Sequence, residues 1–114
     1  MAMTTKVIVT KTFSISPNTE TYQTLYTVSP GLKLRLKKIK VHFPTGVASQ
    51  LHVKIYHGWM SVSSKEGFFT GDNVLLEHDL DVEYGSEAHV RVYFKNTSGA
   101  STKECVISME GEEQ

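Results

Sequence analysis

Apolar and polar residues alternate with a period of two along most of the chain, and this alternation limits the possible folds more than any other feature. The clearest rows are Leu51, Val53 and Ile55, and the run 88–94, in which every second residue is apolar. Such a period places successive side chains on opposite faces of a β-strand. No stretch of ten residues sustains the apolar stripe of a helix. The sequence therefore predicts an all-β protein.

Clusters of Gly, Pro, Asn, Asp and Ser separate these rows at intervals of about ten to fifteen residues, which is typical of antiparallel sandwiches. We predict about eight strands, at 6–15, 20–28, 32–43, 51–57, 59–63, 74–82, 87–95 and 103–110. Two facing sheets would bury one apolar face each, so we expect an antiparallel β-sandwich with jelly-roll-like topology. The 114 residues should form one domain, with residues 1–5 and 111–114 as flexible termini.

The face assignment is consistent within most strands. Tyr22, Tyr26 and Val28 share one parity, which predicts that they point to the same side. In the strand 32–43, however, the apolar residues change parity after Leu36 and resume at Ile39. One extra residue in a strand restores the inward direction and bends the strand. We therefore predict a β-bulge at Lys37-Lys38.

The charges are divided along the chain although they sum to zero. Residues 1–57 contain eight Lys or Arg and one acid, whereas residues 58–114 contain four Lys or Arg and eleven acids. The basic group is Lys33, Arg35, Lys37, Lys38 and Lys40, and the acidic group is Glu77, Asp79, Asp81, Glu83 and Glu87. The basic strand has no interleaved stacking aromatics and no nucleic-acid motif. We expect it to meet acidic surface, within one molecule or across a subunit boundary, rather than nucleic acid.

Catalytic and cofactor signatures are missing from the sequence. It has no Gly-x-Ser-x-Gly elbow, no phosphate-binding glycine loop and no His-Glu-x-x-His. The five histidines lack a recognised ligand spacing, with Asp72, Asp79 and Asp81 a somewhat better prospect for calcium than for zinc. Cys105 alternates with core-type residues and is expected to be an inert buried thiol. We expect no enzyme, no cofactor and no metal.

The sequence also lacks the features of export and membrane insertion. No secretion-type leader and no run of about 18 apolar residues is present, so no membrane association is expected. The triplet Asn96-Thr97-Ser98 is then interpreted as a polar turn rather than a glycosylation site.

Aromatic residues gather around the predicted short strand 59–63. They are Tyr56, Trp59, Phe68 and Phe69, with Met60 beside them. Core packing is one interpretation, and a sugar-stacking platform or an interface anchor at Trp59 are the others.

The succession "TVSPGLKLRLKKIKVHFPTG", "LHVKIYHGW" and "FFTGDNVLLEHDLDVEYGSEAHVRVYFKNTSG" resembles small β-sandwich proteins of bacteriophages and archaeal viruses. The resemblance lies in the order of turns, and it covers most of the chain. It implies a self-assembling virion protein, either a capsid decoration protein or a minor capsid or tail component, that binds other virion proteins. Such a protein would be a homo-oligomer, with a trimer favoured, and would enter the virion in the host cytoplasm. Otherwise the protein is expected to be soluble and cytoplasmic. A carbohydrate-binding or other ligand-binding module is the alternative.

Overall fold

The strands form where the alternation predicts them. The computed structural model describes residues 4–48, 50–57, 60–63 and 69–114, and for 60–63 it describes the backbone alone. Within these residues the strands are β1 (Thr5–Ile15), β2 (Glu20–Thr27), β3 (Leu34–Phe43), β4 (Leu51–His57), β5 (Met60–Ser63), β6 (Val74–Tyr84), β7 (His89–Asn96) and β8 (Lys103–Glu113). No helix in the described part of the chain is long and apolar enough to cross a membrane.

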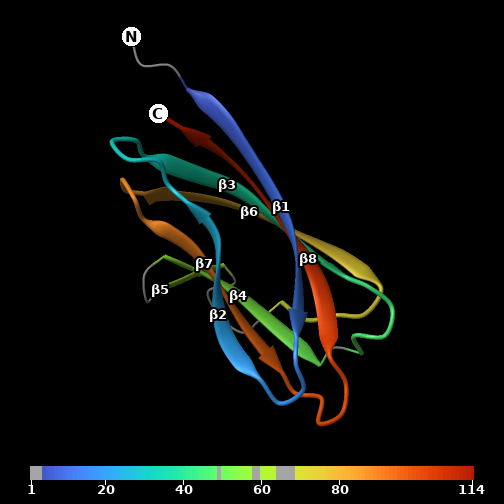
Figure 1. Ribbon diagram of the computed structural model, residues 1–114. Coiled ribbons are helices and arrows are strands. Elements are labelled where there is room, and N and C mark those ends of the chain that lie inside the picture. The colour runs from blue at the N-terminus through green and yellow to red at the C-terminus, as the bar shows by residue number, and fades with distance from the viewer. Residues whose placement is uncertain (1–3, 49, 58–59, 64–68) are drawn as a thin grey trace.

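The eight strands form two antiparallel sheets that face each other (Figure 1). Sheet A has the order β1-β8-β3-β6, and sheet B has the order β2-β7-β4-β5. Apart from the hairpin β4–β5, each strand lies in the opposite sheet to the strand before it. The predicted all-β antiparallel sandwich is thus confirmed, and its strand order is compatible with a jelly roll. The molecule is elongated, with extents of 53 × 23 × 23 Å.

The core consists of the inward rows of both sheets. The central strands β3 and β8 of sheet A supply Leu36, Ile39, Val41, Ile107 and Met109, all without exposed surface. Sheet B supplies Val53, Ile55, Val92 and Phe94, which are buried to the same degree. Removal of this apolar surface from water is the main favourable contribution to folding.

The bulge expected in β3 is confirmed. Leu36 lies opposite Gly111 of β8, and the next aligned pair is Lys38 with Glu110, so Lys37 is the extra residue of β3. Against β6 the register shifts at the same place in the opposite sense, since Leu36 faces Val82 and Lys38 faces Asp79, which leaves two β6 residues opposite Lys37. The bulge allows Leu36 and Ile39, three positions apart, to point into the core.

A second bulge, which the alternation did not predict, lies in β2. The register with β7 shifts between Thr24 and Tyr26, and the extra residue, Leu25, is 1% exposed. Tyr22 therefore points outward and is 44% exposed. The prediction that Tyr22 shares a face with Tyr26 and Val28 is wrong, because the bulge reverses the parity between them.

The C-terminal residues 111–114 were expected to be flexible, but the structure orders them. Gly111 to Glu113 complete β8, which pairs with both β1 and β3. Gln114 exchanges backbone hydrogen bonds with Lys33, at 2.8 and 3.0 Å. Glu113 is 4% exposed and its carboxylate accepts a hydrogen bond from the Tyr26 hydroxyl. The polar end of β8 remains ordered because its backbone is paired on both sides. At the N-terminus, Thr5 begins β1, and residues 1–3 lie outside the described residues.

Candidate functional site

The outward side chains of sheet A form a charged face. The basic strand β3 lies in the middle of this face, between the acidic strands β6 and β8. One row across the sheet joins Lys6 of β1, Glu112 of β8, Arg35 of β3 and Glu83 of β6. The sign of the charge alternates from strand to strand along this row. Opposite charges on neighbouring strands stabilise a sheet, whereas like charges directly opposite destabilise it.

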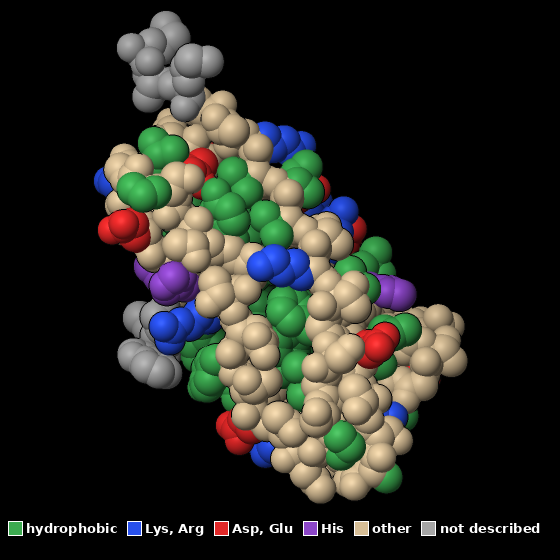
Figure 2. Space-filling model, in the orientation of Figure 1, with side chains coloured by type: hydrophobic (Ala, Val, Ile, Leu, Met, Phe, Trp, Pro, Cys, Tyr) green, Lys and Arg blue, Asp and Glu red, His purple; other side chains and the backbone are tan. Residues whose placement is uncertain are grey.

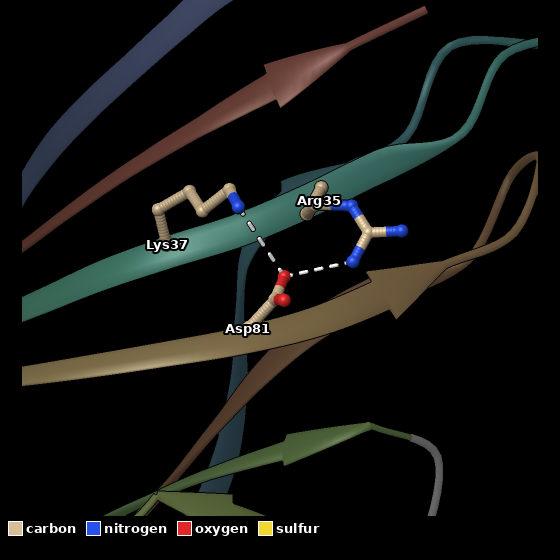
Figure 3. A network of polar contacts seen from close by, with 3 residues as sticks. All are labelled: Arg35, Lys37 and Asp81. Atoms are coloured by element: carbon tan, nitrogen blue, oxygen red, sulfur yellow. Dashed lines mark hydrogen bonds and ion pairs between the residues drawn. The ribbon is translucent and has the colours of Figure 1, made fainter.

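Ion pairs join β3 to β6 along the charged face. Arg35 Nη1 lies 2.8 Å from Asp81 Oδ1, and Lys37 Nζ approaches the same oxygen at 3.4 Å (Figure 3). Lys38 pairs with Asp79 at 3.8 Å and Lys40 pairs with Glu77 at 3.6 Å. The bulge makes this possible, since it lets Lys37 and Lys38 reach two successive carboxylates of β6.

These ion pairs are exposed to water, so they orient the charged side chains but add little to the free energy of unfolding. The paired side chains retain between 33% and 85% of their surface in water. The hydrogen bond from Arg35 lowers the pKa of Asp81, and the same bond raises the pKa of Arg35. Water and salt screen such contacts strongly. The expected meeting of the basic strand with the acidic group thus occurs within one molecule.

Two predicted members of the site lie in turns rather than in strands. Lys33 lies in the turn before β3, where its backbone pairs with Gln114 and where it lines a small hollow with Arg35 and Glu83 at the end of the charged face. Glu87 lies in the turn between β6 and β7 with a φ of 62°. Trp59 is outside the described residues. The structure therefore brings together Arg35, Lys37, Lys38 and Lys40 with Glu77, Asp79, Asp81 and Glu83.

Metal ligands do not converge in the described part of the chain, where no group of three or more His, Cys, Asp or Glu is arranged to hold an ion. Asp72 instead forms hydrogen bonds with the backbone of the turn after β3. Its carboxylate accepts backbone hydrogen bonds from Gly46 at 2.8 Å and Ala48 at 3.0 Å. These bonds, with Ala48 first, lower the pKa of Asp72.

Cys105 lies on the inner face of β8 with no exposed surface. Burial raises the pKa of its thiol to about 12. A thiol in this environment is protonated at neutral pH and is a poor nucleophile.

A tyrosine cluster on the outer face of sheet B was not foreseen from the sequence. It consists of Tyr22 of β2, Tyr56 of β4 and Tyr93 of β7. The ring centroids lie 5.1 Å apart for Tyr22 and Tyr93, and 5.7 Å apart for Tyr22 and Tyr56. The Tyr93 hydroxyl donates a hydrogen bond to Glu20 at 2.6 Å, and burial together with this carboxylate raises the pKa of Tyr93. The cluster could be detected from the sequence only if the β2 bulge and the pairing of β2 with β7 were already known.

Comparison with solved structures shows a likeness in fold. No protein-family model matches the chain, and no curated protein matches it. A solved structure from a study of Bacillus endospore appendages, described as disulfide-linked pili, is similar at 13% sequence identity and a TM-score of 0.46. The alignment covers 94% of this chain and 86% of that chain. The resemblance to virion proteins stays a prediction from the order of turns.

Proposed function

We propose that this protein is a structural subunit that assembles with copies of itself through protein–protein contacts, without catalytic activity. The proposal rests on the two edge strands of sheet A, which are long and paired on one side. The edge strands β1 and β6 are 11 residues long each, and within the described residues each has one strand partner in the sheet. Long edges expose backbone donors and acceptors that can pair with another chain.

The side chains at these edges support the same proposal. Inward-pointing apolar residues of β1 and β6, including Val7, Phe13 and Leu80, are only partly buried. Hydrophobic side chains reach the surface along β1 (Figure 2). On the outer face, Ile8 of β1 is 57% exposed and Leu75 of β6 is 53% exposed. These apolar groups give both edges of sheet A surface that a partner would remove from water.

In its narrower form, the proposal makes the protein a virion component, a capsid decoration protein or a minor capsid or tail protein. Its support is the order of turns in the sequence together with a strand order compatible with a jelly roll. This form places the protein in the virion, after assembly in the host cytoplasm. Its test is to add purified protein to assembled particles of the source virus, with bovine serum albumin as the control for non-specific adsorption. Saturable binding at fixed stoichiometry is the expected result.

Self-assembly is tested by sedimentation velocity and light scattering over a range of protein concentrations. The expected result is a trimer, another closed oligomer or a larger assembly. Raising the salt concentration should weaken the assembly only modestly, because apolar contacts supply most of the affinity and exposed charges mainly select the partner. A protein that stays monomeric up to millimolar concentration contradicts the proposal.

A ligand-binding module is the second candidate, and the tyrosine cluster favours it. Tyr22 exposes 44% of its surface on the outer face of sheet B, where a sugar ring can stack. Binding to a glycan array that falls at least about tenfold in Tyr22→Ala, a loss of about 1.4 kcal/mol, supports this candidate. The matched control is Thr12→Ala, because Thr12 is exposed but lies on sheet A rather than in the cluster on sheet B. Equal binding by both variants excludes the cluster as the site.

A further inference from the structure

The two edges of sheet A have matching directions and lengths. Each strand in the order β1-β8-β3-β6 is antiparallel to its neighbour, so β6 runs opposite to β1. If a second copy is placed beside the first in the same orientation, its β1 lies antiparallel to β6 of the first. Both strands have 11 residues, Thr5–Ile15 and Val74–Tyr84. Full overlap places Thr5 opposite Tyr84 and Ile15 opposite Val74.

The inner rows of the two edges are complementary in this register. The inner row of β1 is Val7, Val9, Lys11, Phe13 and Ile15, and that of β6 is Val74, Leu76, His78, Leu80 and Val82. Full overlap brings Val7 opposite Val82, Val9 opposite Leu80, Phe13 opposite Leu76, and the one polar residue of each row, Lys11 and His78, opposite each other. A slip of two residues in either direction places Lys11 opposite a leucine. The polarity pattern therefore selects one register, as buried faces do within a sheet.

The charged face selects the same arrangement. The row Lys6, Glu112, Arg35, Glu83 ends with a base at the β1 edge and an acid at the β6 edge. In full overlap Lys6 of the next copy lies opposite Glu83, so the alternation of charge continues from one copy into the next. Within the described residues neither Lys6 nor Glu83 is part of an ion pair.

We propose that β1 of one copy pairs antiparallel with β6 of the next copy, with Lys6 opposite Glu83, so that sheet A continues between subunits. This inference rests on the proposed function and names the surface through which assembly occurs. The contact is heterologous, because two different edges meet. It generates a ring where the rotation between subunits closes, and an open filament where it does not.

Pairing of like edges is less favourable. Two β6 edges would place the acidic row Glu77, Asp79, Asp81 and Glu83 against itself, and like charges directly opposite destabilise a sheet. Two β1 edges would bring the lysines of two copies together and leave the acidic edge without a partner.

Four exposed positions provide a test by disulfide formation: Thr10, Thr12, Glu77 and Asp79. In the proposed register Thr10→Cys faces Asp79→Cys, and Thr12→Cys faces Glu77→Cys. Directly opposite residues have Cα atoms about 4.5–5.5 Å apart, which lies within the range of about 4.4–6.8 Å for a disulfide. The crossed pairs, Thr10→Cys with Glu77→Cys and Thr12→Cys with Asp79→Cys, use the same substitutions displaced by two residues. Such diagonal neighbours are about 7–8 Å apart.

Each double variant is oxidised at the concentration where the wild type assembles and is then separated on a denaturing gel without reductant. We expect ladders of covalent multimers from the two matched pairs, loss of the ladders with reductant, and no ladders from the crossed pairs. A disulfide within one copy is excluded, because three strand spacings of about 4.8 Å separate β1 from β6. Cys105 is buried and does not compete. Circular dichroism of each variant checks that the fold is retained.

The outcomes separate the inference from the proposed function. An assembled wild type whose matched pairs give no ladder overturns the edge pairing and leaves self-assembly standing. A ladder from the crossed pairs alone overturns the register. The single variant Thr10→Cys, without a cysteine on β6, is oxidised in the same way. Covalent dimers of this single variant indicate pairing of two β1 edges and also overturn the proposal. A wild type that stays monomeric refutes the proposed function itself.

Discussion

Asn96, at the end of β7, fastens one end of the sandwich, and its replacement by aspartate tests this role. The side chain is 1% exposed. Its Nδ2 donates to the carbonyl oxygens of Ile15 at 2.9 Å, Ser101 at 2.9 Å and Ser16 at 3.2 Å. Its Oδ1 accepts a hydrogen bond from the backbone N–H of Ser98 at 2.9 Å. The side chain thus joins the turn after β1 to the turn after β7.

Asn96→Asp preserves the shape and replaces the donor nitrogen with an oxygen. Hydrogen bonds to the three carbonyls are lost, and each is worth about 1 kcal/mol net. The new carboxylate also faces those carbonyl oxygens in a buried site, where an uncompensated charge is costly. We expect the free energy of unfolding to fall by about 3–5 kcal/mol at pH 7, a large share of the roughly 5–15 kcal/mol typical of a domain.

Urea unfolding followed by circular dichroism measures this loss. The midpoint should fall while the slope m stays unchanged, because the surface exposed on unfolding is the same. Asn96→Ala, which removes the bonds without adding charge, should lose less. A loss below about 1 kcal/mol for Asn96→Asp would refute the reasoning.

The sign of the pH dependence gives a second check on Asn96→Asp. A buried carboxylate surrounded by carbonyl oxygens has a pKa above its unfolded value. Its protonated form is therefore favoured in the folded state, and stability is lost as the pH rises through the folded pKa. The deficit relative to the wild type should shrink between pH 7 and about pH 4.

Four further expectations follow from the same structure. Gly111→Ala should cost about 1–3 kcal/mol in urea unfolding, since a Cβ at Gly111 would lie 2.7 Å from the carbonyl oxygen of Arg35; an unchanged midpoint would contradict the close approach of β8 and β3. Hydrogen bonds from Ser29 and Tyr26 lower the pKa of Glu113. The free energy of unfolding of the wild type should therefore fall as the pH drops below about 4, and that of Glu113→Gln should fall less. Parallel curves of unfolding free energy against pH for the two proteins would show that Glu113 does not stabilise the fold. Asp81→Asn should shift the urea midpoint far less than Asn96→Asp, because its ion pairs are exposed; a comparable shift would contradict that assignment. The thiol of Cys105 should resist Ellman's reagent at pH 8 in the folded protein and react fully in urea, because it is buried; rapid labelling of the folded protein would show that β8 opens.

Features that depend on local alternation could be predicted from the sequence. The strand bounds agree closely, and the β3 bulge is visible because apolar rows on both sides of Lys37 have opposite parity. The β2 bulge was missed because tyrosine is tolerated on either face of a sheet, so Tyr22 gave no sign of reversed parity. Of the candidate site, the partnership of the basic and acidic groups could be predicted from charge.

Features that depend on pairing distant segments could not be predicted from one sequence. Asn96 was interpreted as part of a polar turn, although its importance comes from contacts with Ile15 and Ser16, about 80 positions away. Residues 111–114 were expected to be flexible. Their order comes from backbone pairing with β1 and β3, which side-chain composition does not reveal.

The position of β8 has a consequence for how the chain folds. The last strand in the sequence lies between β1 and β3, so these two strands have no contact through sheet A until β8 enters between them. During synthesis, residues 5–15 must wait for residues 103–113 before they gain their partner. Closing such a large separation is slow, and mostly non-local sheets typically fold in milliseconds to seconds. Until the last strand inserts, the nascent chain presents an open slot that a strand from another chain can enter, which makes the final insertion the step most exposed to misassembly.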